Sequence, residues 1–150
     1  MKYYLAYGSN LNLSQMKYRC PYASLVGTTV LKDYRLAFKG GMDNFAYLTI
    51  EESAGDYVPL GIFKITKKDE KNLDIYEGYP ELYEKRYISV TINKFKHKAL
   101  IYVMKNNFDY HLPSSDYIDI CLQGYNDFEF DKELLNRAYD YTKTNKILKR

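Results

Sequence analysis

The sequence has few of the residues that build metal and redox sites. Its 150 residues include 2 Cys, 2 His and no Trp. Cys20 and Cys121 lie far apart, in a pattern typical of neither a disulfide framework nor a metal site, and we expect both to be small buried hydrophobic residues. His97 and His111 have no acidic or thiol partner at a recognised ligand spacing. The sequence therefore predicts no metal site.

The chain also lacks strong net charge and long hydrophobic runs. It has 22 Lys and Arg against 19 Asp and Glu, a net charge of +3, which is too small a surplus to indicate nucleic-acid binding. We interpret the basic and aromatic stretch 94–98 as a solvated hairpin tip. No run of about 18 apolar residues is present, and residues 1–8 run out of apolar residues too early for a signal peptide. We expect a cytoplasmic protein with neither a membrane nor a nucleic-acid partner.

The motifs of nucleotide-binding proteins and serine hydrolases are missing as well. There is no phosphate-binding P-loop, and Gly8 and the Gly40–Gly41 pair do not form a GxGxxG pattern. Ser9 follows a glycine but lies outside a Gly-x-Ser-x-Gly motif, so a serine hydrolase would have to recruit a distant histidine. Both classes are disfavoured.

What the chain does contain is material for one mixed domain. No repeat or linker divides it, so we expect a single domain over residues 1–150, and its hydrophobic content of 46% suffices for a core. Gly40–Gly41 and Asn93–Lys94 are expected turns between neighbouring strands, which makes much of the sheet antiparallel. Strand-like patterns, typical of a curled sheet or small barrel, occupy residues 2–7, 23–36, 46–51, 57–66, 86–93 and 98–104.

Four helices are expected beside these strands. Asn12 can cap the first helix and Pro21 stops it, while Thr66 and Asp69 form a capping-box-like start for the second, which ends at Gly78. The third follows residues 113–115 and carries an apolar stripe. The expected bounds are 13–19, 66–77, 116–125 and 131–142, with residues 143–150 frayed.

The turn after the first strand is the first candidate site. Tyr7, Gly8, Ser9, Asn10 and Leu11 lead from a buried strand into a helix within a few residues. Free backbone N–H groups in such a turn can hold a carboxylate or an oxyanion. The alternative is that the glycine only permits a tight turn and the polar residues only cap the helix.

The second candidate is Glu77, in the last turn of a helix that Gly78 closes. The negative end of the helix dipole and a surrounding of Tyr76, Tyr79 and Tyr83 should raise the proton affinity of this carboxylate. A raised carboxyl pKa suits a general acid and base. The alternative is an ordinary polar side chain that points into water before a C-cap glycine.

Together these segments resemble the γ-glutamylcyclotransferase-like family, which includes γ-glutamylamine cyclotransferases and avirulence-induced proteins. The similarity spans about residues 2–125 and consists of several motifs in order. They are Tyr4–Leu11 followed by Met16, Arg19, Cys20 and Pro21, then Leu73–Pro80 with Tyr83, and then Pro113–Ile118 through Gly124.

The resemblance implies an α+β fold in which a small mixed β-barrel is flanked by helices. It implies that Glu77 is the catalytic acid and base, that residues 7–11 form the substrate loop and that Tyr117 lines the pocket. The tyrosine that follows the glutamate corresponds to Tyr83 in one branch and to Tyr87 in another, and we favour Tyr83.

The implied reaction converts a γ-glutamyl group to 5-oxoproline and releases an amine or amino acid without a cofactor. The implied partner is a small γ-glutamyl molecule. The leaving group stays open, because the segment after Glu77 is typical of the amine branch while the later helix is typical of the amino acid branch. The alternative function is a non-catalytic small-molecule binding module on the same fold.

Overall fold

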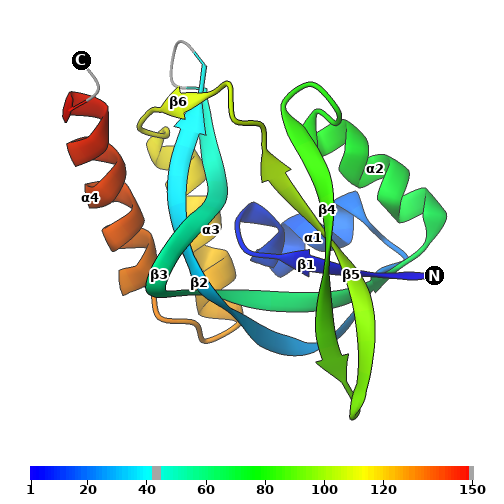
Figure 1. Ribbon diagram of the computed structural model, residues 1–150. Helices are drawn as coiled ribbons and strands as arrows, with labels where there is room; N and C mark the ends of the chain where they lie inside the picture. The colour runs from blue at the N-terminus through cyan, green and yellow to red at the C-terminus, as the bar shows by residue number, and fades with distance from the viewer. Residues whose placement is uncertain (42–44, 149–150) are drawn as a thin grey trace.

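The computed structural model describes residues 1–41 and 45–148 and forms one curled, mixed sheet with helices around it (Figure 1). The strand order is β4-β5-β1-β3-β2-β6. The central strand β1 pairs with β3 in antiparallel and with β5 in parallel orientation. The strands are β1 (Lys2–Ala6), β2 (Ser24–Gly40), β3 (Ala46–Ile65), β4 (Tyr83–Ile92), β5 (Phe95–Met104) and β6 (Asp109–Tyr110).

Strands β2 and β3 form a long hairpin with an irregular segment in its middle. Between the pairs Lys32–Tyr57 and Tyr34–Glu52, Asp33 stands opposite residues 53–56. Asp33 adopts a positive φ of 63°, and its Oδ1 accepts a hydrogen bond from the N–H of Gly55 at 3.0 Å. Two strands were expected here, over 46–51 and 57–66. They form one bent strand instead, because residues 53–56 make a bulge within the strand and do not end it.

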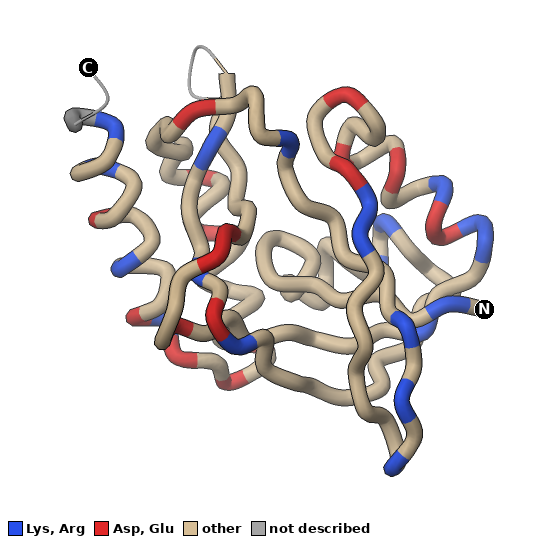
Figure 2. Tube along the Cα trace, viewed as in Figure 1, with Lys and Arg blue, Asp and Glu red and all other residues tan. Residues whose placement is uncertain are grey.

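Two turns were expected between neighbouring strands, at Asn93–Lys94 and at Gly40–Gly41. Asn93 and Lys94 both have positive φ, 50° and 73°, and connect the pair Ile92–Phe95, so the predicted two-residue turn is confirmed. Figure 2 shows basic residues at this turn and on the adjoining part of β5. At the other hairpin Gly40 still belongs to β2, and residues 42–44 lie outside the described part of the chain.

The helices begin at the predicted caps. Asn12 Oδ1 accepts the N–H of Gln15 at 3.1 Å, and Thr66 and Asp69 exchange hydrogen bonds in a capping box. Gly78 ends the second helix in the left-handed conformation, with φ 61°. The helices are α1 (Leu13–Arg19), α2 (Lys67–Glu77), α3 (Ser115–Asp127) and α4 (Glu133–Leu148), and a short 3₁₀ helix, η1, covers Ser9–Leu11.

Helix α4 is longer than expected. The prediction that residues 143–150 fray is wrong for 143–148, which continue the helix, while 149–150 lie outside the described residues. The buried Thr142 holds α4 to the sheet, since its Oγ1 accepts the N–H of Phe38 at 2.9 Å and donates to the carbonyl of Ala138 at 2.7 Å. Asn145 Nδ2 then donates to the carbonyl of Tyr141 at 2.8 Å and extends the helix beyond this anchor.

The curled sheet is a half-barrel whose interior is the core. Side chains connect its distant parts: Met104 N donates to Thr49 Oγ1 at 3.0 Å, which joins β5 to β3. Cys20 and Cys121 are both buried and unpaired, as predicted. In the described part of the chain, no helix is long and apolar enough to cross a membrane.

Candidate active site

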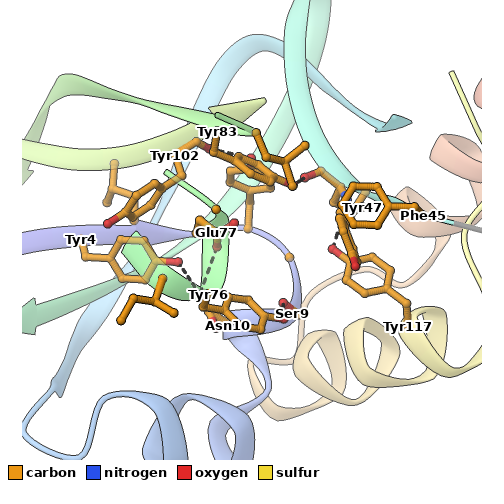
Figure 3. A pocket seen from close by; sticks show the side chains of 17 residues that line it. Tyr4, Ser9, Asn10, Phe45, Tyr47, Tyr76, Glu77, Tyr83, Tyr102 and Tyr117 are labelled. Atoms are coloured by element: carbon orange, nitrogen blue, oxygen red, sulfur yellow. Dashed lines mark hydrogen bonds between the residues drawn. The ribbon is translucent and has the colours of Figure 1, made fainter. Parts of the chain in front are cut away.

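A cavity of about 280 Å³ opens where the end of β1 meets the C-terminus of α2, the middle of the sheet and the start of α3 (Figure 3). Most of its wall is aromatic or aliphatic. Its lining consists of Tyr4, Leu5, Tyr7, Gly8, Ser9, Asn10, Phe45, Tyr47, Leu48, Ile75, Tyr76, Glu77, Gly78, Leu82, Tyr83, Tyr102 and Tyr117. The two candidate segments, 7–11 and 76–83, thus meet at one cavity.

Glu77 is the last residue of α2 and faces this cavity. Protein surrounds the carboxyl on its other sides, and this burial raises the pKa of Glu77 to about 8. The positive charge of Arg19 acts in the opposite direction and lowers the pKa in part. The side chain therefore does not extend into open water, and it holds its proton in a large fraction of molecules at neutral pH.

Asn10 links Glu77 to the loop after β1. Its Nδ2 donates to Tyr4 Oη at 2.8 Å and makes a long hydrogen bond of 3.5 Å to Glu77 Oε1. Its Oδ1 accepts a hydrogen bond from Nη1 of Arg19. The substrate loop predicted from the first motif therefore contacts the predicted acid and base directly.

The rest of the turn is held in place by hydroxyl groups. Tyr7 Oη donates to the carbonyl of Tyr102 at 2.7 Å, and Tyr125 Oη donates to the carbonyl of Tyr7 at 3.2 Å. Ser9 Oγ lies 2.7 Å from Tyr76 Oη. Gly8 borders the cavity at the residue before η1.

Leu11 alone among the predicted loop residues does not line the cavity. Its side chain is fully buried in the core beneath the loop. Helix α3 packs directly on this part of the backbone: a Cβ added to Gly124 would lie 2.6 Å from Asn12 N and 2.7 Å from Leu11 C. Leu11 therefore supports the loop from below, and Gly124 permits that close packing.

Tyr83 and Tyr117 both form hydrogen bonds with the backbone of Leu48 in β3. Tyr83 Oη donates to the carbonyl of Leu48 at 2.6 Å, and the N–H of Leu48 donates to Tyr117 Oη at 3.0 Å. Tyr83 lines the cavity, while Tyr87 is half-exposed on β4 and receives a hydrogen bond from Lys2 Nζ at 3.2 Å. Of the two alternatives, Tyr83 is the one at the cavity.

Several cavity residues escaped the sequence analysis. Phe45 and Tyr47 form one side of the mouth, and their rings lie against each other with centroids 5.0 Å apart. Tyr102 comes from β5 and Tyr4 from β1. The abundance of tyrosine, 18 residues, was a signal, but it does not say which of them share a cavity.

The arrangement supplies a group that can carry protons. The described residues contain no group of three or more His, Cys, Asp or Glu that could hold an ion. They do contain one carboxyl with a pKa near neutrality, an amide donor beside it and neutral tyrosines around it. This geometry is suited to acid–base chemistry on a small substrate shielded from water.

Comparisons with known proteins identify the family to which this half-barrel belongs. The family model described as "Gamma-glutamyl cyclotransferase, AIG2-like" matches residues 4–119, which is most of the chain. The protein belongs to this family. No curated protein sequence matches it significantly.

Solved structures agree with this assignment. One described as gamma-glutamyl cyclotransferase superimposes with a TM-score of 0.76 at 25% identity, covering 97% of this chain and 86% of that chain. A human protein described as uncharacterized gives the same TM-score, identity and coverage. YkqA from Bacillus subtilis shares the fold, with a TM-score of 0.75, 18% identity, and 96% of this chain against 55% of that one. The expected fold class is confirmed.

Proposed function

We propose that this chain cyclises the γ-glutamyl group of a small substrate to 5-oxoproline and releases an amine or amino acid. The α-amine of the γ-glutamyl group attacks its own γ-carbonyl carbon, so a C–N bond forms in the new ring and the bond to the leaving nitrogen breaks. No electrons leave the substrate and no co-reactant is consumed. The enzyme has to fold the substrate, move protons and stabilise the developing oxyanion.

Glu77 is the proposed acid and base. Its carboxylate takes a proton from the α-ammonium and so frees the lone pair for attack. The protonated carboxyl then donates to the leaving nitrogen and collects the second proton that the attacking nitrogen releases. That proton ends on the departing amine, which leaves as an ammonium ion. A carboxyl with a pKa of about 8 can both accept and donate protons near neutral pH.

The substrate loop has the proposed role of holding negative charge. Ser9 and Asn10 form the first turn of η1, where backbone N–H groups have no partner inside the helix. We assign them, with the adjoining Gly8, to the α-carboxylate or to the developing oxyanion. Tyr83 and Tyr117 close the pocket around the folded substrate.

One observation carries this proposal: the carboxyl of Glu77 is largely enclosed, faces the cavity and contacts Asn10 of the loop. Membership of the family supports the same chemistry. A carboxyl with no reaction to perform would be more stably placed in water, since burying it without a cationic partner in direct contact is unfavourable.

The test is release of 5-oxoproline by the purified protein, with no added metal or nucleotide. The substrates are γ-glutamyl dipeptides, ε-(γ-glutamyl)lysine and glutathione, compared for the parent, Glu77→Gln and Glu81→Gln. Glu81 is an exposed carboxylate in the same segment and is the matched control. We expect Glu77→Gln to lower kcat by at least about 10²-fold and Glu81→Gln to match the parent. A folded Glu77→Gln protein that retains most of the turnover would exclude the assigned role.

The second candidate function is a binding module that uses the same cavity without turnover. Two results together would support this function. The folded parent would give no product from any of the substrates, and calorimetric titration would still detect binding of a γ-glutamyl conjugate. The presence of Glu77 favours the enzyme, because loss of this side chain would be the simplest route to a non-catalytic relative.

A further inference from the structure

The amide of Asn10 has one defined orientation, and Arg19 sets it. An amide side chain carries an acceptor on one end and a donor on the other. Arginine can only donate, so Arg19 Nη1 must face Asn10 Oδ1, as it does. The Nδ2 end is thereby directed toward Tyr4 Oη and Glu77 Oε1. The donor side of the amide faces the catalytic carboxyl for this reason.

Arg19 is itself fixed from three directions. Its guanidinium carbon lies 3.3 Å from the centroid of the Tyr76 ring, and its Nη2 donates to Gln15 Oε1 at 2.9 Å. Its backbone carbonyl accepts a hydrogen bond from Asn72 Nδ2 at 3.1 Å. The side chain therefore spans from the end of α1 to the last turn of α2 and does not depend on solvent for its position.

We propose that Arg19 is a positioning residue for Glu77, which acts through Asn10 by keeping the amide donor on the carboxylate. This inference rests on the proposed function of Glu77. Without Arg19 the amide can rotate by half a turn and place Oδ1 beside the carboxylate, where two acceptors repel each other. The ionised form of Glu77, which starts the reaction, would then lose its donor.

The electrostatic surroundings of Glu77 agree with this role. Four tyrosines face it: Tyr4 and Tyr7 at the β1 end, Tyr76 on α2 and Tyr83 on β4. Burial raises the pKa of each of them, so they stay neutral in the working pH range. Among the described residues, Arg19 is therefore the charge that favours the ionised form of Glu77.

The experiment follows the titration of Glu77 by carboxyl ¹³C NMR, together with the pH profile of kcat/KM. The variants are Arg19→Met, Arg19→Gln and Arg19→Lys, with Arg137→Met as control because Arg137 is exposed on α4. Methionine removes the donor, and glutamine can both donate and accept, so neither fixes the amide. We expect the Glu77 titration and the acidic limb to move upward by about one pH unit, which is a tenfold loss at pH 7.

Lysine can only donate, so Arg19→Lys should restore most of the titration, and Arg137→Met should leave it unchanged. If Arg19→Met fails to fold, Arg19→Gln decides. A folded Arg19→Gln protein in which Glu77 titrates as in the parent overturns the proposal. Because the NMR titration needs no turnover, a protein that makes no 5-oxoproline would refute the proposed function while the link between Arg19 and Glu77 is still measured.

Discussion

The hydroxyl groups of Ser9 and Tyr76 lie 2.7 Å apart, although the two residues are 67 positions apart in the chain. One belongs to the loop after β1 and the other to the last turn of α2. The contact places the loop beside the segment that carries Glu77 and holds Tyr76 under the guanidinium of Arg19.

This contact predicts measurable coupling. Ser9→Ala and Tyr76→Phe each remove one hydroxyl, and the double variant removes the whole interaction. We expect a coupling free energy of about 0.5–1.5 kcal/mol from urea unfolding of the four proteins. Effects that add to within about 0.3 kcal/mol would show that the two hydroxyls do not stabilise each other.

The raised pKa of Glu77 predicts how stability depends on pH. In the unfolded chain a glutamate has a pKa of about 4.3, whereas in the folded protein it is about 8. Between these values the unfolded state releases the proton and the folded state keeps it, so this group's contribution to stability falls as pH rises, by up to about 1.4 kcal/mol per unit.

Glu77→Gln lacks this titration. We expect the variant to gain stability relative to the parent between about pH 5 and 8, and the difference to vanish near pH 4. The measurement is the free energy of unfolding in urea at several pH values, with Glu81→Gln as the exposed control. Curves for parent and Glu77→Gln that run parallel over this range would contradict the raised pKa.

Tyr83 and Tyr87 allow a paired test. Tyr83→Phe removes the donor to the carbonyl of Leu48, and we expect a loss of about 1–2 kcal/mol in unfolding free energy together with slower turnover. Tyr87→Phe removes only an exposed contact with Lys2 and should change stability by less than about 0.5 kcal/mol. Turnover of Tyr83→Phe that is as fast as that of Tyr87→Phe and of the parent would exclude a role for the Tyr83 hydroxyl in the reaction.

The leaving group should be an amine without a carboxylate. Among the described residues that line the cavity, Glu77 is the sole acidic or basic side chain. Aromatic rings form the mouth: Tyr47 lies between Phe45 and Tyr117, with centroid distances of 5.0 and 5.1 Å. A second carboxylate on the substrate would lose water there without gaining a cation.

A matched pair of substrates tests this. γ-Glutamylphenethylamide and γ-glutamylphenylalanine differ only in the carboxylate beside the leaving nitrogen. We expect kcat/KM for 5-oxoproline release to be at least about tenfold higher for γ-glutamylphenethylamide. This ratio corresponds to a difference of about 1.4 kcal/mol in free energy. A preference for γ-glutamylphenylalanine would mean that a cation or N–H group outside the described lining binds the carboxylate.

The features that the sequence predicted well are those set by interactions between residues close together in the chain. The caps at Asn12 and Thr66 and the helix end at Gly78 each depend on residues within one turn, so single motifs locate them. The last of these also locates Glu77. The bulge at Asp33 could not be predicted, because it depends on how residues 53–56 pair with the other strand of the hairpin.

The cavity residues also divide into those that local motifs locate and those that depend on strand pairing. Glu77 and the loop were found from their motifs, whereas Phe45, Tyr47 and Tyr102 reach the cavity through strand pairing over long separations. Leu11 is the opposite case: it belongs to the loop motif, but its side chain is buried in the core, and Gly124 of α3 packs on its backbone. Sequence proximity to a motif does not determine which side of the chain faces the substrate.

The backbone of Leu48 forms hydrogen bonds on both sides of its Cα: its carbonyl accepts from Tyr83, and its N–H donates to Tyr117. Helix α3 and strand β4 are thereby attached to the same point of β3, and neither tyrosine can move away without breaking a bond. A reaction between two ends of a single flexible molecule is favoured by a rigid, preorganised binding site. For the proposed cyclisation, the shape that brings the amine onto the carbonyl would then exist before the substrate arrives, and the entropy of folding the substrate would be lost on binding, not during the chemical step.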